Sequence, residues 1–292
     1  MTILVTGSTG HIGRQVLQYL AGMGAELSAL TRSPERAKFP DGIAAVKGDI
    51  SDLDSMRAAM KGIDTIFLLL PSNPGEQMHA LQILGTARDM GVKGIVYLSV
   101  FRSAEYVELP HFASKYGAER LIEQFDLPAT VLKPAYFIQN DLGQKGPLLS
   151  QGVYGMPIGR QGISMVDARD IGEAAGLELL RRERAHDRLP RETYALVGPD
   201  VIDAETVTSI WTEVLGRPIR YGGDDLDAFE KQVKSSGPAW MAYDMRLMMN
   251  RYQRDGLIAV AADIARLTEL FGRAPRSYRD FAAEAAAEWQ KG

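Results

Sequence analysis

The stretch that decides the fold is Thr2-Ile3-Leu4-Val5-Thr6-Gly7-Ser8-Thr9-Gly10-His11-Ile12-Gly13-Arg14. Its apolar start predicts a strand, and the pattern from Arg14 to Leu20 predicts a helix directly after a glycine-rich turn. Glycine at position 7 can adopt the positive φ that a tight turn needs, and glycine at position 13 lets the helix pack close to the strand. The sequence therefore predicts a strand–turn–helix unit of an α/β fold.

The same turn has the features of an anion-binding site. Gly10 leaves room for backbone N–H groups to approach a pyrophosphate, and the positive end of the following helix favours negative charge. The spacing is GxxGxxG, and its position between a strand and a helix supports a dinucleotide-binding interpretation. A tight turn that binds no ligand is the alternative.

The end of the second predicted strand bears on the choice of dinucleotide. Residues 27–30 lead into Thr31-Arg32-Ser33-Pro34, with no acidic residue to bind a ribose 2′-hydroxyl. Arg32 can instead contact a 2′-phosphate, and Arg36 can assist. This favours NADP over NAD, whereas two solvated arginines are the alternative.

A third contact to the dinucleotide is expected after the third predicted strand. Asp49 could hydrogen-bond the adenine, and Ile50 could cover a face of the ring. Asp49 could equally serve only to form the turn.

Short apolar runs alternate with helical patterns through the first half of the chain, which is typical of βαβ units and a parallel, doubly wound sheet. The expected strands are 3–5, 27–30, 43–46, 65–70, 95–99 and 129–132, and the expected helices are 11–22, 53–61, 75–90 and 111–125. Glycine and proline are dense from 143 to 162, which predicts a long loop or short irregular strands.

We therefore expect two domains in a Rossmann-type α/β protein. The first, a dinucleotide-binding domain, spans residues 1–150, and residues 163–198 add strands and a helix to it. The second, residues 199–292, is a smaller and mostly helical substrate lobe.

Composition excludes several classes of function. The 33 Lys and Arg against 37 Asp and Glu give a net charge of −4, which argues against a nucleic-acid partner. There is no cysteine, and the four histidines are scattered, so no metal site is expected. No apolar run approaches membrane-spanning length and no signal-peptide pattern is present, which predicts a cytoplasmic protein without a membrane partner. The oligomeric state is left open.

The glycine turn and Thr31–Pro34 together resemble the short-chain dehydrogenase/reductase superfamily. Members of that superfamily normally work with Tyr-x-x-x-Lys, but no tyrosine in this chain has a lysine four residues later. His111-Phe112-Ala113-Ser114-Lys115 stands there instead, and the i, i+4 spacing puts His111 and Lys115 on one helix face. The lysine role is kept, while the tyrosine role is lost or passes to His111, which could also simply cap or pack.

Further motifs resemble the NmrA-like group of atypical short-chain reductases over residues 2–275. They are Thr31–Pro34, His111 with Lys115, Lys133–Asn140, Asp167–Gly172 and Tyr194–Pro199. The resemblance implies cofactor contacts from Gly7, Ser8, Thr9, Gly10, His11, Ile12, Gly13, Arg32, Leu70, Pro71, Ser72, Asn73, Lys115, Pro134, Ala135, Tyr136, Phe137 and Asn140. Ser99 matches the serine region of the superfamily loosely, and Tyr136 is a second candidate proton donor.

These features predict an NADPH-dependent reductase that transfers hydride to a quinone or a similar conjugated aromatic acceptor. Such acceptors can take a proton from water after the hydride arrives, so losing the tyrosine is compatible with activity. Lys115, His111 and Tyr136 are the candidate catalytic residues. The alternative is an NADP(H)-binding redox sensor without turnover, which the missing tyrosine favours. A sugar epimerase or dehydratase ranks third because its chemistry depends on that tyrosine.

Overall fold

The computed structural model describes residues 2–291 and divides into two compact units. The first unit runs to Pro134 and resumes over Ala168–Ala195. The second unit holds Ala135–Asp167 and the chain from Leu196 on. The predicted boundary of the first domain is residue 150. In the structure, the chain leaves the first unit earlier, at Pro134, which is the last residue of a strand.

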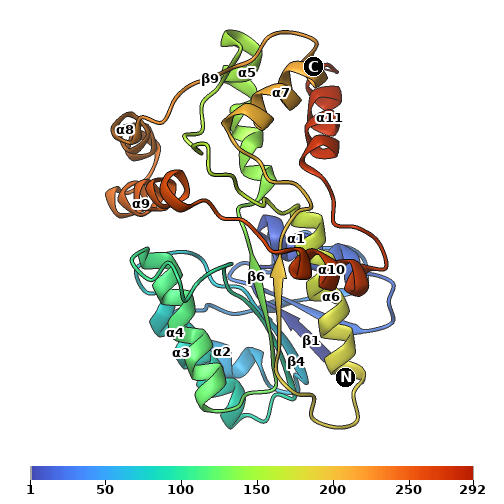
Figure 1. Cartoon of the computed structure of the whole chain (residues 1–292). Coiled ribbons are helices and arrows are strands. Elements are labelled where there is room, and N and C mark those ends of the chain that lie inside the picture. The colour runs from blue at the N-terminus through green and yellow to red at the C-terminus, as the bar shows by residue number, and fades with distance from the viewer. Residues whose placement is uncertain (1, 292) are drawn as a thin grey trace. The chain divides into compact units, whose positions relative to one another are not determined.

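A seven-stranded sheet forms the centre of the first unit within the described residues (Figure 1). Its strands are β1 (Thr2–Val5), β2 (Glu26–Thr31), β3 (Ile43–Lys47), β4 (Thr65–Leu68), β5 (Gly94–Leu98), β6 (Ala129–Pro134) and β8 (Glu192–Leu196). Their order is β3-β2-β1-β4-β5-β6-β8, and neighbouring strands from β3 to β6 are parallel. The direction of strand progression reverses between β1 and β4, and in such sheets ligands bind beyond the carboxyl ends of the strands at that point.

Helices cover both faces of this sheet, so the predicted doubly wound α/β fold is confirmed. On one face lie α1 (His11–Leu20) and α6 (Ala168–Arg184), and on the other lie α2 (Leu53–Ala59), α3 (Glu76–Asp89) and α4 (Pro110–Gln124). Helices α1 and α6 pack closely against each other. A Cβ atom at Gly172 of α6 would lie only 2.6 Å from the side chain of Gln15 of α1, so glycine at this position makes the close approach possible.

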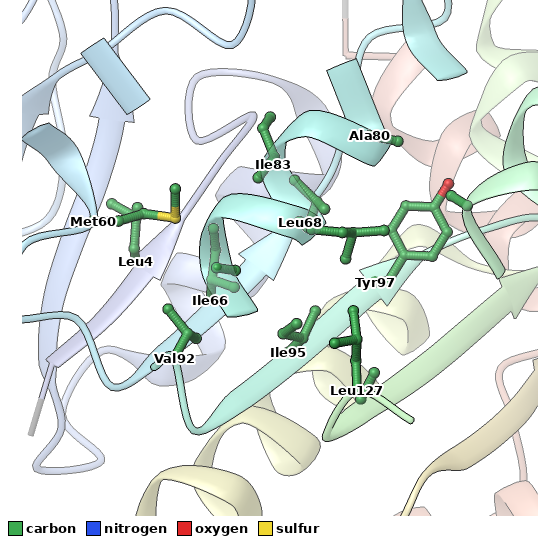
Figure 2. Packing of buried hydrophobic residues seen from close by; sticks show 14 of the residues in the cluster. Leu4, Met60, Ile66, Leu68, Ala80, Ile83, Val92, Ile95, Tyr97 and Leu127 are labelled. Atoms are coloured by element: carbon green, nitrogen blue, oxygen red, sulfur yellow. The ribbon is translucent and has the colours of Figure 1, made fainter. Parts of the chain in front are cut away.

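A core of aliphatic side chains joins the sheet to α2, α3 and α4 (Figure 2). Ile66 and Leu68 of β4 and Ile95 of β5 are almost fully buried there, against Ile83 of α3. Tyr97 belongs to the same cluster and is completely buried. This packing holds the strand ends, and the loops that follow them, in fixed positions.

The second unit is mostly helical after residue 203, as predicted. It contains η1 (Ile138–Gln144), α5 (Lys145–Gln151), β7 (Val153–Tyr154), α7 (Ala204–Leu215), β9 (Arg220–Tyr221), α8 (Leu226–Ser236), α9 (Ala239–Asp255), α10 (Ala261–Phe271) and α11 (Tyr278–Trp289). Strands β7 and β9 pair in parallel as a small separate sheet.

The prediction of a long loop or irregular strands over 143–162 is wrong for the first part of that segment. Residues 145–151 form the helix α5. Pro147 is compatible with this helix because it lies in the first turn, where a backbone N–H has no acceptor within the helix and its absence has no cost. Gly152 then ends the helix in a left-handed conformation with φ of 64°. Within residues 2–291 no helix is long and apolar enough to cross a membrane.

Candidate functional site

A cavity of about 1200 Å³ opens at the carboxyl ends of β1, β2, β3 and β4, at the point where the strand order reverses. It lies entirely within the first unit. Of the residues predicted to contact a cofactor, the cavity is lined by Gly7, Thr9, Gly10, Arg32, Asp49, Ile50, Leu70, Pro71 and Asn73. The structure thus brings together residues from four separate loops.

The glycine turn between β1 and α1 is built around the positive φ of Gly7, which is 61°. The amide of Gly10 donates to the carbonyl of Gly7 at 2.9 Å and closes the turn. A Cβ at Gly13 would lie 2.2 Å from that same carbonyl oxygen, so only glycine allows α1 to start here. Gly10 precedes the helix without a side-chain cap, which leaves the first N–H groups of α1 available to a ligand.

Other predicted residues of the turn do not line the cavity. Ser8 is buried and donates its hydroxyl to the carbonyl of Leu30 at 2.6 Å, which ties the turn to β2. Ile12 is buried in the core and His11 is exposed. Ser72, which lies after β4 and not in this turn, is exposed as well. The cofactor contacts of these four residues stay predictions.

Four cationic side chains line the cavity, and only two of them were singled out in the sequence. Arg32 and Arg36 follow β2 as predicted. Arg14 and Lys38 also line it, and both are exposed. Lys38 follows Arg32 and Arg36 closely in the sequence, so it could have been predicted to belong to the same cationic cluster. The cavity wall is therefore strongly positive where it meets the end of β2.

Asp49 is the one acidic side chain on the cavity wall among the described residues, and it forms a local turn. Its carboxylate accepts hydrogen bonds from the amide of Ser51 at 2.9 Å and from the Ser51 hydroxyl at 2.7 Å. These bonds, with a smaller contribution from the charge of Arg32, lower the pKa of Asp49. The turn-forming alternative is thus present in the structure, and adenine recognition stays a prediction.

Lys115 lies on α4 and is buried, with its ammonium group held by an acidic partner. Lys115 Nζ lies 2.7 Å from Glu76 Oε1 and donates more weakly to the carbonyl of Leu98 at 3.4 Å. Glu76 is 1% exposed and is the first residue of α3, three residues after the cavity-lining Asn73. Glu76 could not be predicted from the sequence, because its partner Lys115 is 39 residues away along the chain.

Glu119, further along α4, forms a second acid–lysine pair with Lys133 of β6. Glu119 accepts hydrogen bonds from Ser99 and from Ser103, and its other oxygen lies 2.7 Å from Lys133 Nζ. The hydroxyl of Ser99, at the end of β5, is therefore directed at α4. Between the two pairs, the hydroxyl of Tyr97 has no hydrogen-bond partner among the described residues. Burial, together with the charges of Glu76 and Glu119, raises the pKa of Tyr97.

His111 lies in the first turn of α4, four residues before Lys115, and is half-buried. Its ring packs edge-on against Phe112 with centroids 4.6 Å apart. The shared helix face follows the prediction, whereas a role in proton delivery stays a prediction.

Residues 135–140 belong to the second unit, where Tyr136 enters a buried polar cluster. Its hydroxyl lies 3.5 Å from Asp141 Oδ1, and Tyr154 donates to the other oxygen at 2.8 Å. Tyr278 also donates to Asp141. Burial, followed by the charge of Asp141, raises the pKa of Tyr136 well above its usual value. These contacts favour a structural role for Tyr136, and proton donation by it stays a prediction.

Comparisons with known proteins agree with this architecture. The model of the NmrA-like family matches residues 1–275. A (4-alkanoyl-5-oxo-2,5-dihydrofuran-3-yl)methyl phosphate reductase of Streptomyces griseus is 30% identical, covering 97% of this chain and 98% of its own. An NAD(P)H azoreductase of Xenophilus azovorans is 26% identical, covering 98% of both chains.

Among solved structures, an NADPH-dependent quinone oxidoreductase of Escherichia coli in complex with NADPH has the same fold. It superimposes with a TM-score of 0.84 at 21% identity, covering 97% of this chain and 99% of its own. The family match spans both units and most of the chain, so the expected resemblance is confirmed: this chain belongs to the NmrA-like family.

Proposed function

We propose that the protein is an NADPH-dependent reductase that transfers hydride to a quinone or a similar conjugated aromatic acceptor. The general part of this statement, an NAD(P)H-dependent oxidoreductase, agrees with the relatives, which are named as reductases and an NAD(P)H azoreductase. The observation that carries the preference for NADPH is the group of cationic side chains after β2 in the wall of the dinucleotide cavity. The choice of a quinone-like acceptor rests on the family resemblance and on the missing tyrosine.

The residues present in the cavity fit a phosphorylated dinucleotide. The Gly7 turn and the uncapped start of α1 offer backbone N–H groups to a pyrophosphate. Arg32 and its cationic neighbours offer donors to a ribose 2′-phosphate, and no acidic side chain at the end of β2 competes for the 2′ position. This donor set supports NADPH over NADH.

The chemistry at the reacting end needs little from the protein as an acid. A nicotinamide nucleotide, when bound, supplies the hydride to the acceptor. Lys115 is the group proposed to orient the nicotinamide ribose, and Glu76 holds its ammonium group in place. A quinone takes up the hydride and then a proton from water, so the missing tyrosine is no obstacle.

The proposal is tested by a screen of quinones, azo dyes and triphenylmethane dyes with NADPH and with NADH, monitored by oxidation of the nicotinamide at 340 nm. Binding of both nucleotides in both redox states is measured in parallel by calorimetry. We expect turnover with conjugated acceptors and a preference for NADPH. Tight nucleotide binding without turnover on any acceptor would contradict the reductase and leave the redox sensor.

A further inference from the structure

The first unit contains a second cavity, at the opposite edge of its sheet from the dinucleotide cavity. Its volume is about 360 Å³, which lies at the lower end of the range for small-molecule sites. It is formed by the turns that lead into β5, β6 and β8, at residues 91–93, 125–128 and 185–189. Its walls include the apolar side chains of Val92, Ile95 and Leu127, which are buried, and of Phe125.

Arg182, near the end of α6, lies in the wall of this cavity and is 3% exposed. Its Nε donates to the Thr130 hydroxyl at 2.8 Å, and its Nη2 donates to the carbonyl of Pro190 at 2.9 Å. Nη1 has no hydrogen-bond partner among the described residues. A buried guanidinium normally uses all of its donors, so this one has spare capacity.

No carboxylate of the described part of the chain pairs with Arg182. The nearby Glu178 accepts from the Thr130 hydroxyl at 2.6 Å and forms its ion pair with Arg181 at 2.7 Å. Burial, aided by the charge of Arg181, lowers the pKa of Arg182 to about 10, so the side chain stays protonated at neutral pH. A buried positive charge without a counterion is costly, and an anionic ligand would compensate it.

The rim of the cavity carries further charged side chains, which pair with one another or with neighbouring aspartates. Besides Arg182, its lining includes the cationic side chains of Arg88, Lys93 and Arg188, against only two acidic ones. Each of these three rim cations pairs with an aspartate: Lys93 with Asp64 at 2.7 Å, Arg88 with Asp89 at 3.1 Å and Arg188 with Asp126 at 3.0 Å. Arg182 is therefore the one lysine or arginine in the cavity wall, among the described residues, that no carboxylate pairs with. Arg88 stacks over the ring of Phe125 at 4.4 Å, so a cation and an aromatic face adjoin at the opening.

We propose that this cavity binds a small organic carboxylate that carries an aromatic or alicyclic ring. The carboxylate would receive donors from Arg182, and the ring would contact Phe125, Val92 and Leu127. A guanidinium edge matches the geometry of a carboxylate, and apolar walls favour a hydrophobic body over a hydrated inorganic anion. This site is separate from the dinucleotide cavity and does not depend on the proposed reductase activity.

Calorimetric titration with 1-naphthoate tests the proposal, with 1-naphthalenemethanol as the uncharged probe of the same ring. We expect one site for naphthoate on the wild-type protein, at least about tenfold weaker binding of the alcohol, and no competition by NADP⁺. Ala185→Trp, which fills the cavity, should abolish binding of naphthoate. Arg182→Gln should weaken it at least about tenfold, since it removes the charge but keeps a hydrogen-bonding side chain.

Arg184→Gln is the matched control, because Arg184 lies on the same helix but outside the cavity, and it should leave the affinity unchanged. A cooperative thermal unfolding transition of each variant verifies that it is folded, and Ala185→Trp decides the question if Arg182→Gln does not fold. No naphthoate binding to the wild type, equal binding to Ala185→Trp, or displacement by NADP⁺ would each overturn the proposal.

Discussion

Arg32 is the single residue on which the preference for NADPH most depends, because it is the first cation after β2 and lines the dinucleotide cavity. We expect Arg32→Ala to weaken NADPH binding by about 1.5 kcal/mol or more, roughly tenfold, while NADH binding hardly changes. The neighbouring Arg36 keeps the loss near this lower value.

Calorimetry with both nucleotides measures this effect. Arg57→Ala serves as the control, because Arg57 is exposed on α2, pairs with Asp54 at 3.2 Å and does not line the cavity. Equal losses for NADPH and NADH would show that Arg32 does not contact the 2′-phosphate.

The Glu76–Lys115 pair allows the structural and functional roles of Lys115 to be separated. Removing one member of a buried ion pair leaves an uncompensated charge, so Glu76→Gln and Lys115→Met should each lower the free energy of unfolding by about 3–5 kcal/mol. The double variant should regain most of that stability, because neither charge remains. Its turnover and its KM for NADPH should stay impaired, since the ammonium group is still absent.

Denaturant unfolding and steady-state kinetics on all four proteins check this cycle. If the double variant recovered its activity together with its stability, Lys115 would be a structural residue and the proposed contact with the ribose would be wrong.

At the scale of elements, two of the three glycines between β1 and the first turn of α1 are required for different physical reasons. These two are Gly10 and Gly13. Gly10 has an extended conformation, with φ −81° and ψ 174°, that valine can also adopt. A Cβ there would meet only the Gly7 carbonyl, at 3.2 Å, whereas a Cβ at Gly13 would overlap with the backbone of Gly7 and Ser8. One glycine thus leaves room for a ligand, and the other allows the packing of α1 on β1.

We therefore expect Gly10→Val to fold with a nearly normal melting temperature but to lose NADPH affinity by about tenfold or more. Gly13→Ala should instead lower the free energy of unfolding by about 1–3 kcal/mol, because the added methyl group forces α1 away from the strand. Thermal unfolding and nucleotide titration of both variants distinguish these outcomes. Normal NADPH binding by Gly10→Val would place the cofactor elsewhere.

At the scale of the whole molecule, the second unit contains a carboxyl group that couples its stability to pH. Asp141 is fully buried, and burial outweighs the hydrogen bonds from Tyr278, Tyr154 and Tyr136, so its pKa is raised to about 6. The folded state then binds the proton more tightly than the unfolded state does. The stabilisation from this group is present at low pH and is lost as the pH rises through about 6, by about 3 kcal/mol at pH 7.

Asp141→Asn removes this titration and keeps the side-chain shape. We expect the free energy of unfolding of the variant, relative to the wild type, to rise by about 3 kcal/mol between pH 4 and pH 7. Urea unfolding across that range measures it, and the exposed Asp41→Asn is the control. Parallel pH profiles for wild type and Asp141→Asn would show that the pKa of Asp141 is not raised.

Features that depend on near neighbours in the chain could be predicted from the sequence alone. Buried parallel strands are continuous apolar runs, so β1, β2, β4, β5 and β6 could be predicted within a few residues. The edge strand β3 is more exposed, but its apolar run also placed it correctly. The glycine turn and Arg32 could be predicted as well, because a tight turn and the end of a strand require particular residue types at fixed spacing. α5 was missed because its glycines and proline resemble a loop unless their positions within the helix are known.

Contacts between side chains that are distant in the sequence could not be predicted, because they depend on how the elements pack. Lys115 pairs with Glu76, Ser99 donates to Glu119, and Tyr278 donates to Asp141 because separate elements pack together. Likewise, the chain passes into the second unit at Pro134, and that boundary is set by which strands pair and not by local composition. Burial and the energies of ion pairs depend on these long-range contacts, and no short-range pattern encodes them.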